Sequence, residues 1–222
     1  MVVLGCGWSV VRQSDARTER FVRSHRPAIM RAGEAFDVDP RLLASLMFVS
    51  RQGIELPLRG LRERVAVGGE TAGYVPPTLS VGPMRLRLDT VVGALAVETE
   101  CGHKDVTEAS PAGIDCARVS NLARLHQTPR DSVDVILDED RNIQAAALVL
   151  ALYQLQWEAA NPLWSIRDRP DIVATLYRLG VHRSHPHANP QPNEFGRRVL
   201  EAYRRPWIQE AFLAESGRSS RE

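Results

Sequence analysis

The stretch VDPRLLASLMFVSRQ, residues 38–52, decides the fold of this chain. Asp39 is a favoured helix N-cap residue, and Pro40 suits the first helical turn, where its missing N–H has no partner to lose. Residues 42–49 are almost all apolar, so a helix over this stretch is predicted to lie at the centre of the fold. The chain turns polar at Ser50, which raises the question of what the end of a buried helix is used for.

Further helices are predicted on both sides of this central stretch, because apolar residues recur there at helical spacing. The predicted helices cover residues 21–36, 141–159 and 170–179, and others begin after Asp89 and Asn193. Residues 53–83 differ, because glycines and prolines interrupt short apolar pieces. Pro206 divides the last helical stretch in two. The prediction is an all-α domain with a small irregular or β element near residues 60–82.

Length and composition indicate one large domain of ordinary soluble type. The chain has 222 residues, of which 44% are hydrophobic and 25% charged. We assign the domain to residues 18–213 and expect a flexible segment at 1–17 and a disordered tail at 214–222. The net charge of +1 provides no field that would attract nucleic acid, and no apolar run has the length of a transmembrane helix.

The cysteines and the apolar start leave the compartment open. Cys101 and Cys116 either form a disulfide, which would imply an oxidising compartment, or remain two thiols. Residues 1–8, MVVLGCGW, resemble the end of a bacterial lipoprotein signal that would make Cys6 a lipid anchor, although their shortness favours a chance apolar start. If the true start lies upstream, the protein belongs in the cell envelope, the periplasm or outside the cell; otherwise it is cytoplasmic.

The chain has two candidate metal motifs: a histidine-rich loop, and Cys101 and His103 with Cys116, which lack a clear fourth ligand. His182, His185 and His187 form HRSHPH, whose spacing would need a further carboxylate or other ligand to hold a metal ion. Zinc sites in loops usually show tighter ligand pairs. We therefore predict neither a metal nor a cofactor.

Several stretches together resemble a known family. They are AGEAFDVDPRLLASLMFVSRQ (32–52), SVGPMRLRLDT (80–90), NIQAAALVLALYQL (142–155), and DIVATLYRLG (171–180) followed by NPQPNEFGRRVLEAY (189–203). Their order and spacing resemble the soluble lytic transglycosylase family, which has a goose-type lysozyme-like helical fold and cleaves peptidoglycan. The resemblance implies a lysozyme-like fold. It also implies that the partner is a peptidoglycan glycan strand or a muropeptide-like ligand.

The resemblance places Ser50 where the family has its catalytic acid. That acid protonates the glycosidic oxygen and then, as a carboxylate, removes a proton from a sugar hydroxyl. A serine hydroxyl is too weak an acid for this, and loss of general acid catalysis lowers a rate by roughly 10²–10⁴. As a nucleophile, Ser50 would need an adjacent base, and no histidine is near it in sequence. Glu55 and Glu70 are either substitute acids on a Gly-rich loop or, as their residue type favours, exposed surface acids.

Other groove positions follow from the same resemblance. The loop residues that it places in the substrate groove are Ser80, Gly82, Met84 and Arg85. Arg85 stands where the family commonly has glutamine, and it either binds an anionic group or is a solvated surface residue. Tyr177 matches a tyrosine that helps to orient substrate, although by itself it would be interpreted as a core aromatic residue. Arg178 replaces a neighbouring asparagine.

These departures set the functional expectation. Ser50, Arg85 and Arg178 all differ from the family at groove positions. We expect a lytic transglycosylase-like protein that acts on or binds peptidoglycan and is catalytically impaired because its general acid is missing. If active, it would cleave glycan with a substitute carboxylate. The alternative is a non-enzymatic interaction protein on the same scaffold.

Overall fold

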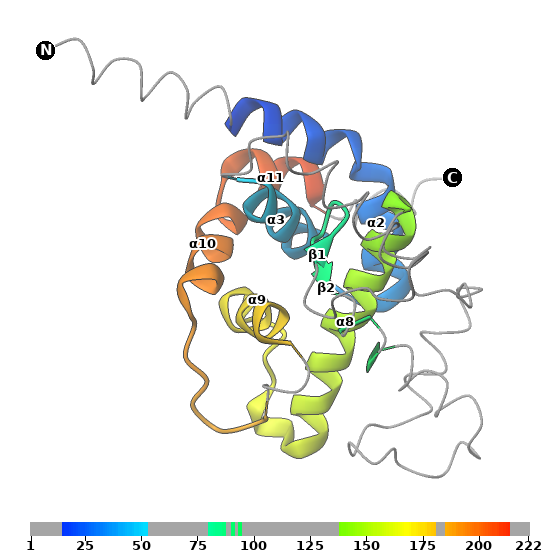
Figure 1. The fold of residues 1–222 in the computed structure, drawn as a ribbon. Coiled ribbons are helices and arrows are strands. Elements are labelled where there is room, and N and C mark those ends of the chain that lie inside the picture. Colours follow the sequence, from blue (N-terminus) through cyan, green and yellow to red (C-terminus); the bar gives the residue numbers. More distant parts are fainter. Residues whose placement is uncertain are drawn as a thin grey trace, which may run out of the picture.

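The structure is a computed structural model, and it describes residues 15–52, 80–87, 90–91, 93–94, 138–180 and 185–213. Most of this described part is helical, as predicted for an all-α domain (Figure 1). After a helix at residues 15–24, the elements are α2 (Arg26–Phe36), α3 (Pro40–Arg51), β1 (Ser80–Val81), β2 (Leu86–Arg87), α8 (Glu139–Ala160), the 3₁₀ turn η1 (Pro162–Trp164), α9 (Pro170–Leu179), α10 (Glu194–Tyr203) and α11 (Pro206–Phe212). No helix in these ranges has the length and apolarity needed to cross a membrane.

Helix α3 forms the centre of the fold, as its sequence predicts. The Asp39 side chain accepts a hydrogen bond from the Arg41 backbone N–H at 2.9 Å, and Pro40 occupies the first turn. Every residue from 42 to 50 is buried. The helix contacts α2, α8, α10 and α11. Each fully buried Leu, Met or Phe side chain contributes roughly 1.5–3 kcal/mol of hydrophobic stabilisation, so this helix holds its neighbours together.

The amino-terminal helical region differs from the prediction in two ways. The helix predicted over 21–36 is two helices, which meet at His25; Pro27 lies in the first turn of α2, where its ring would interrupt a continuous helix. Residues 15–17, which we assigned to the flexible segment, are helical. Asp15 is held there by Gln52, at 3.0 Å, and by Arg205, at 3.2 Å. These partners are distant in sequence, so local composition alone does not reveal them.

Helix α8 matches the strongest predicted helix and begins two residues earlier than predicted. Asp138 caps it by accepting a hydrogen bond from the Arg141 N–H at 2.8 Å. Asn142 is completely buried in its first turn and accepts a hydrogen bond from the Met84 N–H at 3.0 Å. The start of α8 is thereby joined to the hairpin of β1 and β2.

That hairpin is the β element of the described chain; β1 lies at the end of the predicted range of 60–82, and β2 lies beyond it. Ser80 pairs with Arg87, and Val81 with Leu86, in antiparallel register. Residues 60–79 lie outside the described residues. Gly82 has φ +74°, and a Cβ there would lie 2.4 Å from the Asn142 side-chain nitrogen. The turn therefore requires glycine, because both the backbone conformation and the close contact exclude a side chain.

Helices α9 and α10 pack closely and agree with the sequence prediction. Helix α9 ends at Gly180, whose φ is +86°, and Asn193 caps α10 by accepting from the Gly196 N–H at 2.8 Å. A Cβ at Gly196 would lie 2.2 Å from both the Asp171 carbonyl oxygen and the Thr175 hydroxyl oxygen. The two backbones can approach this closely only because residue 196 is glycine.

Candidate functional site

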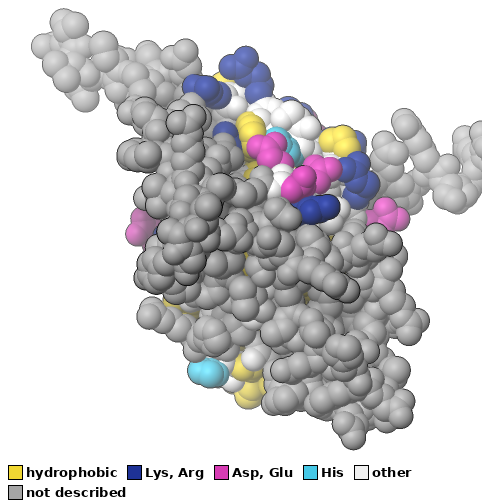
Figure 2. Space-filling model, turned by 45° about the vertical axis from the view of Figure 1, so that its right-hand side comes forward, with side chains coloured by type: hydrophobic (Ala, Val, Ile, Leu, Met, Phe, Trp, Pro, Cys, Tyr) yellow, Lys and Arg dark blue, Asp and Glu magenta, His cyan; other side chains and the backbone are white. Residues whose placement is uncertain are grey.

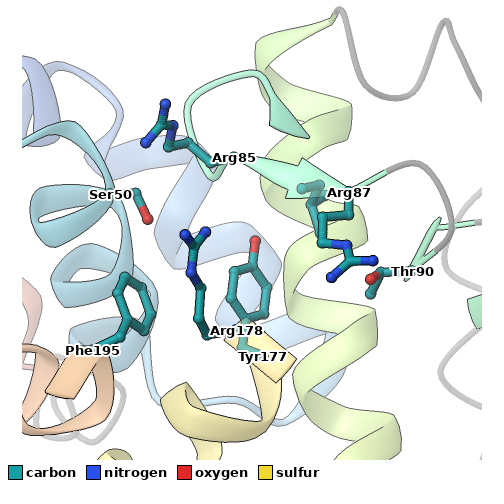
Figure 3. A pocket seen from close by; sticks show the side chains of 8 residues that line it. Ser50, Arg85, Arg87, Thr90, Tyr177, Arg178 and Phe195 are labelled. Atoms are coloured by element: carbon teal, nitrogen blue, oxygen red, sulfur yellow. The ribbon is translucent and has the colours of Figure 1, made fainter. Parts of the chain in front are cut away.

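The carboxyl end of α3 faces the hairpin and the carboxyl end of α9 across a small pocket (Figure 3). Its empty space measures about 320 Å³, including the open solvent at its mouth. The lining residues are Ser50, Arg85, Leu86, Arg87, Thr90, Tyr177, Arg178 and Phe195. They come from segments more than 100 residues apart in the chain, and rigid helices supply most of them.

The structure brings together four of the predicted site residues, namely Ser50, Arg85, Tyr177 and Arg178. The other three loop residues of the prediction are Ser80, Gly82 and Met84. Ser80 lies in strand β1, Gly82 forms the turn, and the Met84 side chain is fully buried in the core. Glu55 and Glu70 lie outside the described residues.

Ser50 differs from the other buried serine of α3. Ser45 donates its hydroxyl to the Arg41 carbonyl oxygen at 2.6 Å, which is the usual i−4 bond of a helical serine. Ser50 is 6% exposed, yet its hydroxyl makes no hydrogen bond within the part of the chain that the structure describes. Figure 3 shows this hydroxyl directed toward the pocket. An uncommitted hydroxyl can donate one hydrogen bond to a bound ligand.

Tyr177 has a defined structural role at the pocket. Its hydroxyl donates to the Met84 carbonyl oxygen at 2.9 Å, and the Met84 N–H donates to Asn142 at 3.0 Å. This chain of hydrogen bonds joins α9, the hairpin and α8. Burial, aided by the nearby Tyr153, raises the pKa of Tyr177 well above its ordinary value, so the hydroxyl keeps its proton. Tyr177 therefore positions the backbone beside Arg85.

Asn142 is the partner that sequence reasoning missed. It is a polar residue at the start of the most apolar predicted helix, and its side chain is completely buried. A buried polar group without a partner costs several kcal/mol, so an isolated asparagine in such a helix indicates a hydrogen bond elsewhere in the fold. That signal was available in the sequence, but it does not identify Met84 as the partner.

The three arginines of the pocket differ in placement. Arg178, in the last turn of α9, lies with its guanidinium carbon 5.8 Å from the centre of the Phe195 ring. Figure 3 shows the Arg178 guanidinium between Ser50 and Tyr177, whereas that of Arg85 is directed away from them and that of Arg87 lies beside Thr90. Arg178 is thus the arginine directed into the pocket.

Arg85 has a backbone conformation that non-glycine residues rarely adopt. Its φ is +53°, in the left-handed region. For an L-residue this conformation costs roughly 1–2 kcal/mol, so the neighbouring contacts must hold it in place. The buried Met84 and its two hydrogen bonds supply that constraint on the preceding residue.

The charged side chains of the described pocket lining are basic. Three arginines and no carboxylate are found among its described lining residues. Helices α3 and α9 both end here, and two helix carboxyl ends are together equivalent to roughly one negative charge. The first turn of α10, which carries Phe195, adds partial positive charge at the rim.

Charges elsewhere on the described surface are arranged differently. Figure 2 shows acidic and basic side chains lying next to one another on one face. The ion pairs that the structure contains there and elsewhere include Arg23–Glu19, Arg31–Asp140, Arg41–Asp39, Arg167–Glu158, Arg169–Asp171 and Arg205–Asp15. Arg178 makes no ion pair with any acidic residue in the described ranges. Other described arginines, Arg141 and Arg204 among them, also lack an ion pair with a described residue, so Arg178 is distinguished by its place in the pocket.

The histidine-rich loop lies elsewhere. His182 is outside the described residues, and the His187 ring packs 5.5 Å from the Trp157 ring at the other end of α8 from Asn142. Within the described ranges, no three histidine, cysteine or acidic side chains are grouped closely enough to bind a metal ion. Cys6, Cys101 and Cys116 also lie outside these ranges.

No protein family, curated protein or solved structure matches this chain. The function is therefore argued from the pocket and from the residues that carry the resemblance.

Proposed function

We propose that this chain is a lysozyme-like helical protein that binds peptidoglycan glycan strands or muropeptide fragments in the pocket at the end of α3, without cleaving them. The observation that carries the proposal is Ser50. It lies at the buried carboxyl end of the central helix, where the resemblance expects a glutamate, and it faces the pocket that contains Tyr177 and Arg178.

The chemistry of the described wall supports the proposal that the protein does not cleave glycan. Glycan cleavage of the lytic type needs one carboxylic acid that first gives and then takes a proton. The described lining has hydroxyls and guanidinium groups but no carboxylate. Neither a serine hydroxyl nor a guanidinium can protonate a glycosidic oxygen at neutral pH.

Binding is supported by the rigidity and composition of the same wall. Ser50, Tyr177 and Phe195 belong to packed helices, and the hairpin is tied to both α8 and α9. The pocket presents hydrogen-bond donors beside two aromatic rings, a combination that suits a sugar with polar edges and an apolar face. A site on rigid elements loses little entropy when it binds.

The decisive experiment compares wild type with Ser50→Glu on purified bacterial sacculi. We expect both proteins to co-sediment with sacculi and only Ser50→Glu to release anhydro-muropeptides, measured by mass spectrometry. Restoring the acid should raise cleavage from background by roughly 10²-fold or more, because that is the contribution of a general acid. Ser50→Gln, which places a side chain of the same length at the pocket but cannot give a proton, is the matched control and should release nothing.

Other results would decide against the proposal. Failure of folded wild type to co-sediment with sacculi would contradict it. Anhydro-muropeptides released by wild type would show instead an enzyme with a substitute acid. Glu55→Gln and Glu70→Gln would then identify the acid, since both residues lie in the segment that leaves α3 just after Ser50.

A further inference from the structure

We propose that the pocket is a carboxylate-binding subsite, in which the Arg178 guanidinium and the Ser50 hydroxyl donate hydrogen bonds to one carboxylate of an acidic muropeptide. This inference rests on the proposed function and names the part of the ligand that the pocket selects. It assigns a new role to the position of the missing acid: the site would accept a negative charge from the ligand instead of supplying one.

The first support is the uncommitted donor at Ser50. The residue is 94% buried, lines the pocket and has no hydrogen-bond partner within the described ranges. The Ser45 hydroxyl on the same helix, in contrast, donates to the Arg41 carbonyl oxygen at 2.6 Å. Buried polar groups are almost always satisfied in native proteins. The Ser50 hydroxyl is not among the described atoms that are shut off from solvent without a partner, so it can be reached from the pocket and is available to a ligand acceptor.

The second support is the setting of Arg178. Its guanidinium lies between Ser50 and Tyr177 in Figure 3, and its guanidinium carbon is 5.8 Å from the centre of the Phe195 ring. Contact with an aromatic ring restricts the orientation of the guanidinium plane while leaving its N–H edges available. A planar fork with available edges binds a carboxylate through two parallel hydrogen bonds.

The third support is the charge and number of donors. The described lining contains no carboxylate that would compete with a ligand for Arg178. Two parallel guanidinium N–H groups match the two oxygens of a carboxylate, and one of these oxygens has a further lone pair for the Ser50 hydroxyl. The Tyr177 O–H already donates a hydrogen bond to the Met84 carbonyl oxygen, so it does not add a further donor.

The test uses ligands that differ only in charge. A muramyl dipeptide with free carboxyl groups and the same compound with these groups converted to carboxamides are titrated calorimetrically into the full chain. We expect the acid to bind roughly 10- to 100-fold more tightly than the amide, which is the usual contribution of a hydrogen bond to a charged group. This preference should weaken as salt concentration rises.

Matched variants assign the effect to the pocket. Arg178→Gln should remove most of the preference for the acid, and Ser50→Ala should reduce it by roughly 2- to 10-fold. Arg31→Gln removes the same charge from an exposed pair on α2, and Ser45→Ala removes a hydroxyl from the bonded serine of α3. Both controls should keep the wild-type preference. Circular dichroism confirms that each variant is folded.

Each alternative result has a defined meaning. Equal binding of acid and amide overturns the carboxylate subsite but leaves glycan binding intact. An acid preference that persists in folded Arg178→Gln overturns the assignment to this pocket. Inorganic phosphate that displaces the acid at lower concentration than acetate does would identify a phosphate site. If neither muropeptide binds but acetate binds in an Arg178-dependent manner, the subsite stands and the proposed function fails; if nothing binds, both fail.

Discussion

The two ends of α3 use polar residues in opposite ways. At its start, Asp39 accepts hydrogen bonds from Arg41, at 2.7 Å, and from the Tyr203 hydroxyl, at 2.6 Å, and Arg41 also donates to Gln209 at 3.1 Å. At its end, the Ser50 hydroxyl faces a pocket and makes no bond to any described residue. The first cluster is satisfied within the protein, whereas the second leaves a hydroxyl open toward the pocket. The number of charged groups alone therefore does not identify a candidate binding site. The more informative property is whether each polar group already has a hydrogen-bond partner within the protein.

The largest expected effect comes from removing the hydrogen bonds of Asp39 at the start of α3. Asp39→Ala should lower the free energy of unfolding by about 2–3 kcal/mol, because it removes a helix cap and leaves Arg41 and Tyr203 without their shared partner. Urea denaturation measures the change. Ser50→Ala, at the other end, should change stability by less than about 0.5 kcal/mol. Similar losses in the two variants would contradict the distinction between the ends.

The second prediction concerns the hairpin that supports the pocket. Gly82→Ala should destabilise the protein by about 1–2 kcal/mol, because residue 82 has φ +74° and its Cβ would overlap Asn142. It should also weaken muropeptide binding, since the displaced turn carries Arg85. Gly93→Ala is the control: a Cβ there meets nothing within 4 Å, and alanine in a helix is neutral or stabilising. Thermal unfolding and calorimetry report the two effects.

The smallest effect is a pH dependence at the satisfied end. Burial and the hydrogen bond to Asp39 raise the pKa of Tyr203 to about 12. Since an unfolded tyrosine ionises near pH 10, the folded state holds this proton more tightly. The stabilisation that this proton gives to the folded state is complete below about pH 10 and is lost as the pH rises toward 12. The melting temperature measured between pH 9 and 11.5 should therefore fall less steeply with rising pH for Tyr203→Phe than for wild type. Identical slopes in the two proteins would contradict this.

Much of the helical framework could be predicted from local sequence. Asp39 and Pro40 start α3, and Asn193 starts α10, through short-range bonds that each residue makes with its own segment. The prediction failed where contacts with distant segments of the chain determine the local structure. The helix at residues 15–24 extends to Asp15 because Gln52 and Arg205 hold that side chain.

The candidate site was predictable to a similar extent. The resemblance named Ser50, Arg85, Tyr177 and Arg178, and the structure places these four around one pocket. It did not name Phe195, which lies against Arg178. Phe195 is close to Arg178 only because α9 and α10 pack at a glycine contact, which no local pattern reports.

The sequence by itself determined that residues 40–51 form a buried helix and that this helix ends without an acid. Helix caps and apolar spacing act within a few residues of chain, so they can be deduced from local sequence. Only the tertiary structure decided that the Ser50 hydroxyl is left open and that the Tyr177 hydroxyl donates to the Met84 carbonyl oxygen. It also decided that the Arg178 guanidinium lies between Ser50 and Tyr177. Hydrogen-bond partners are chosen in three dimensions, among groups that the fold brings together from distant parts of the chain.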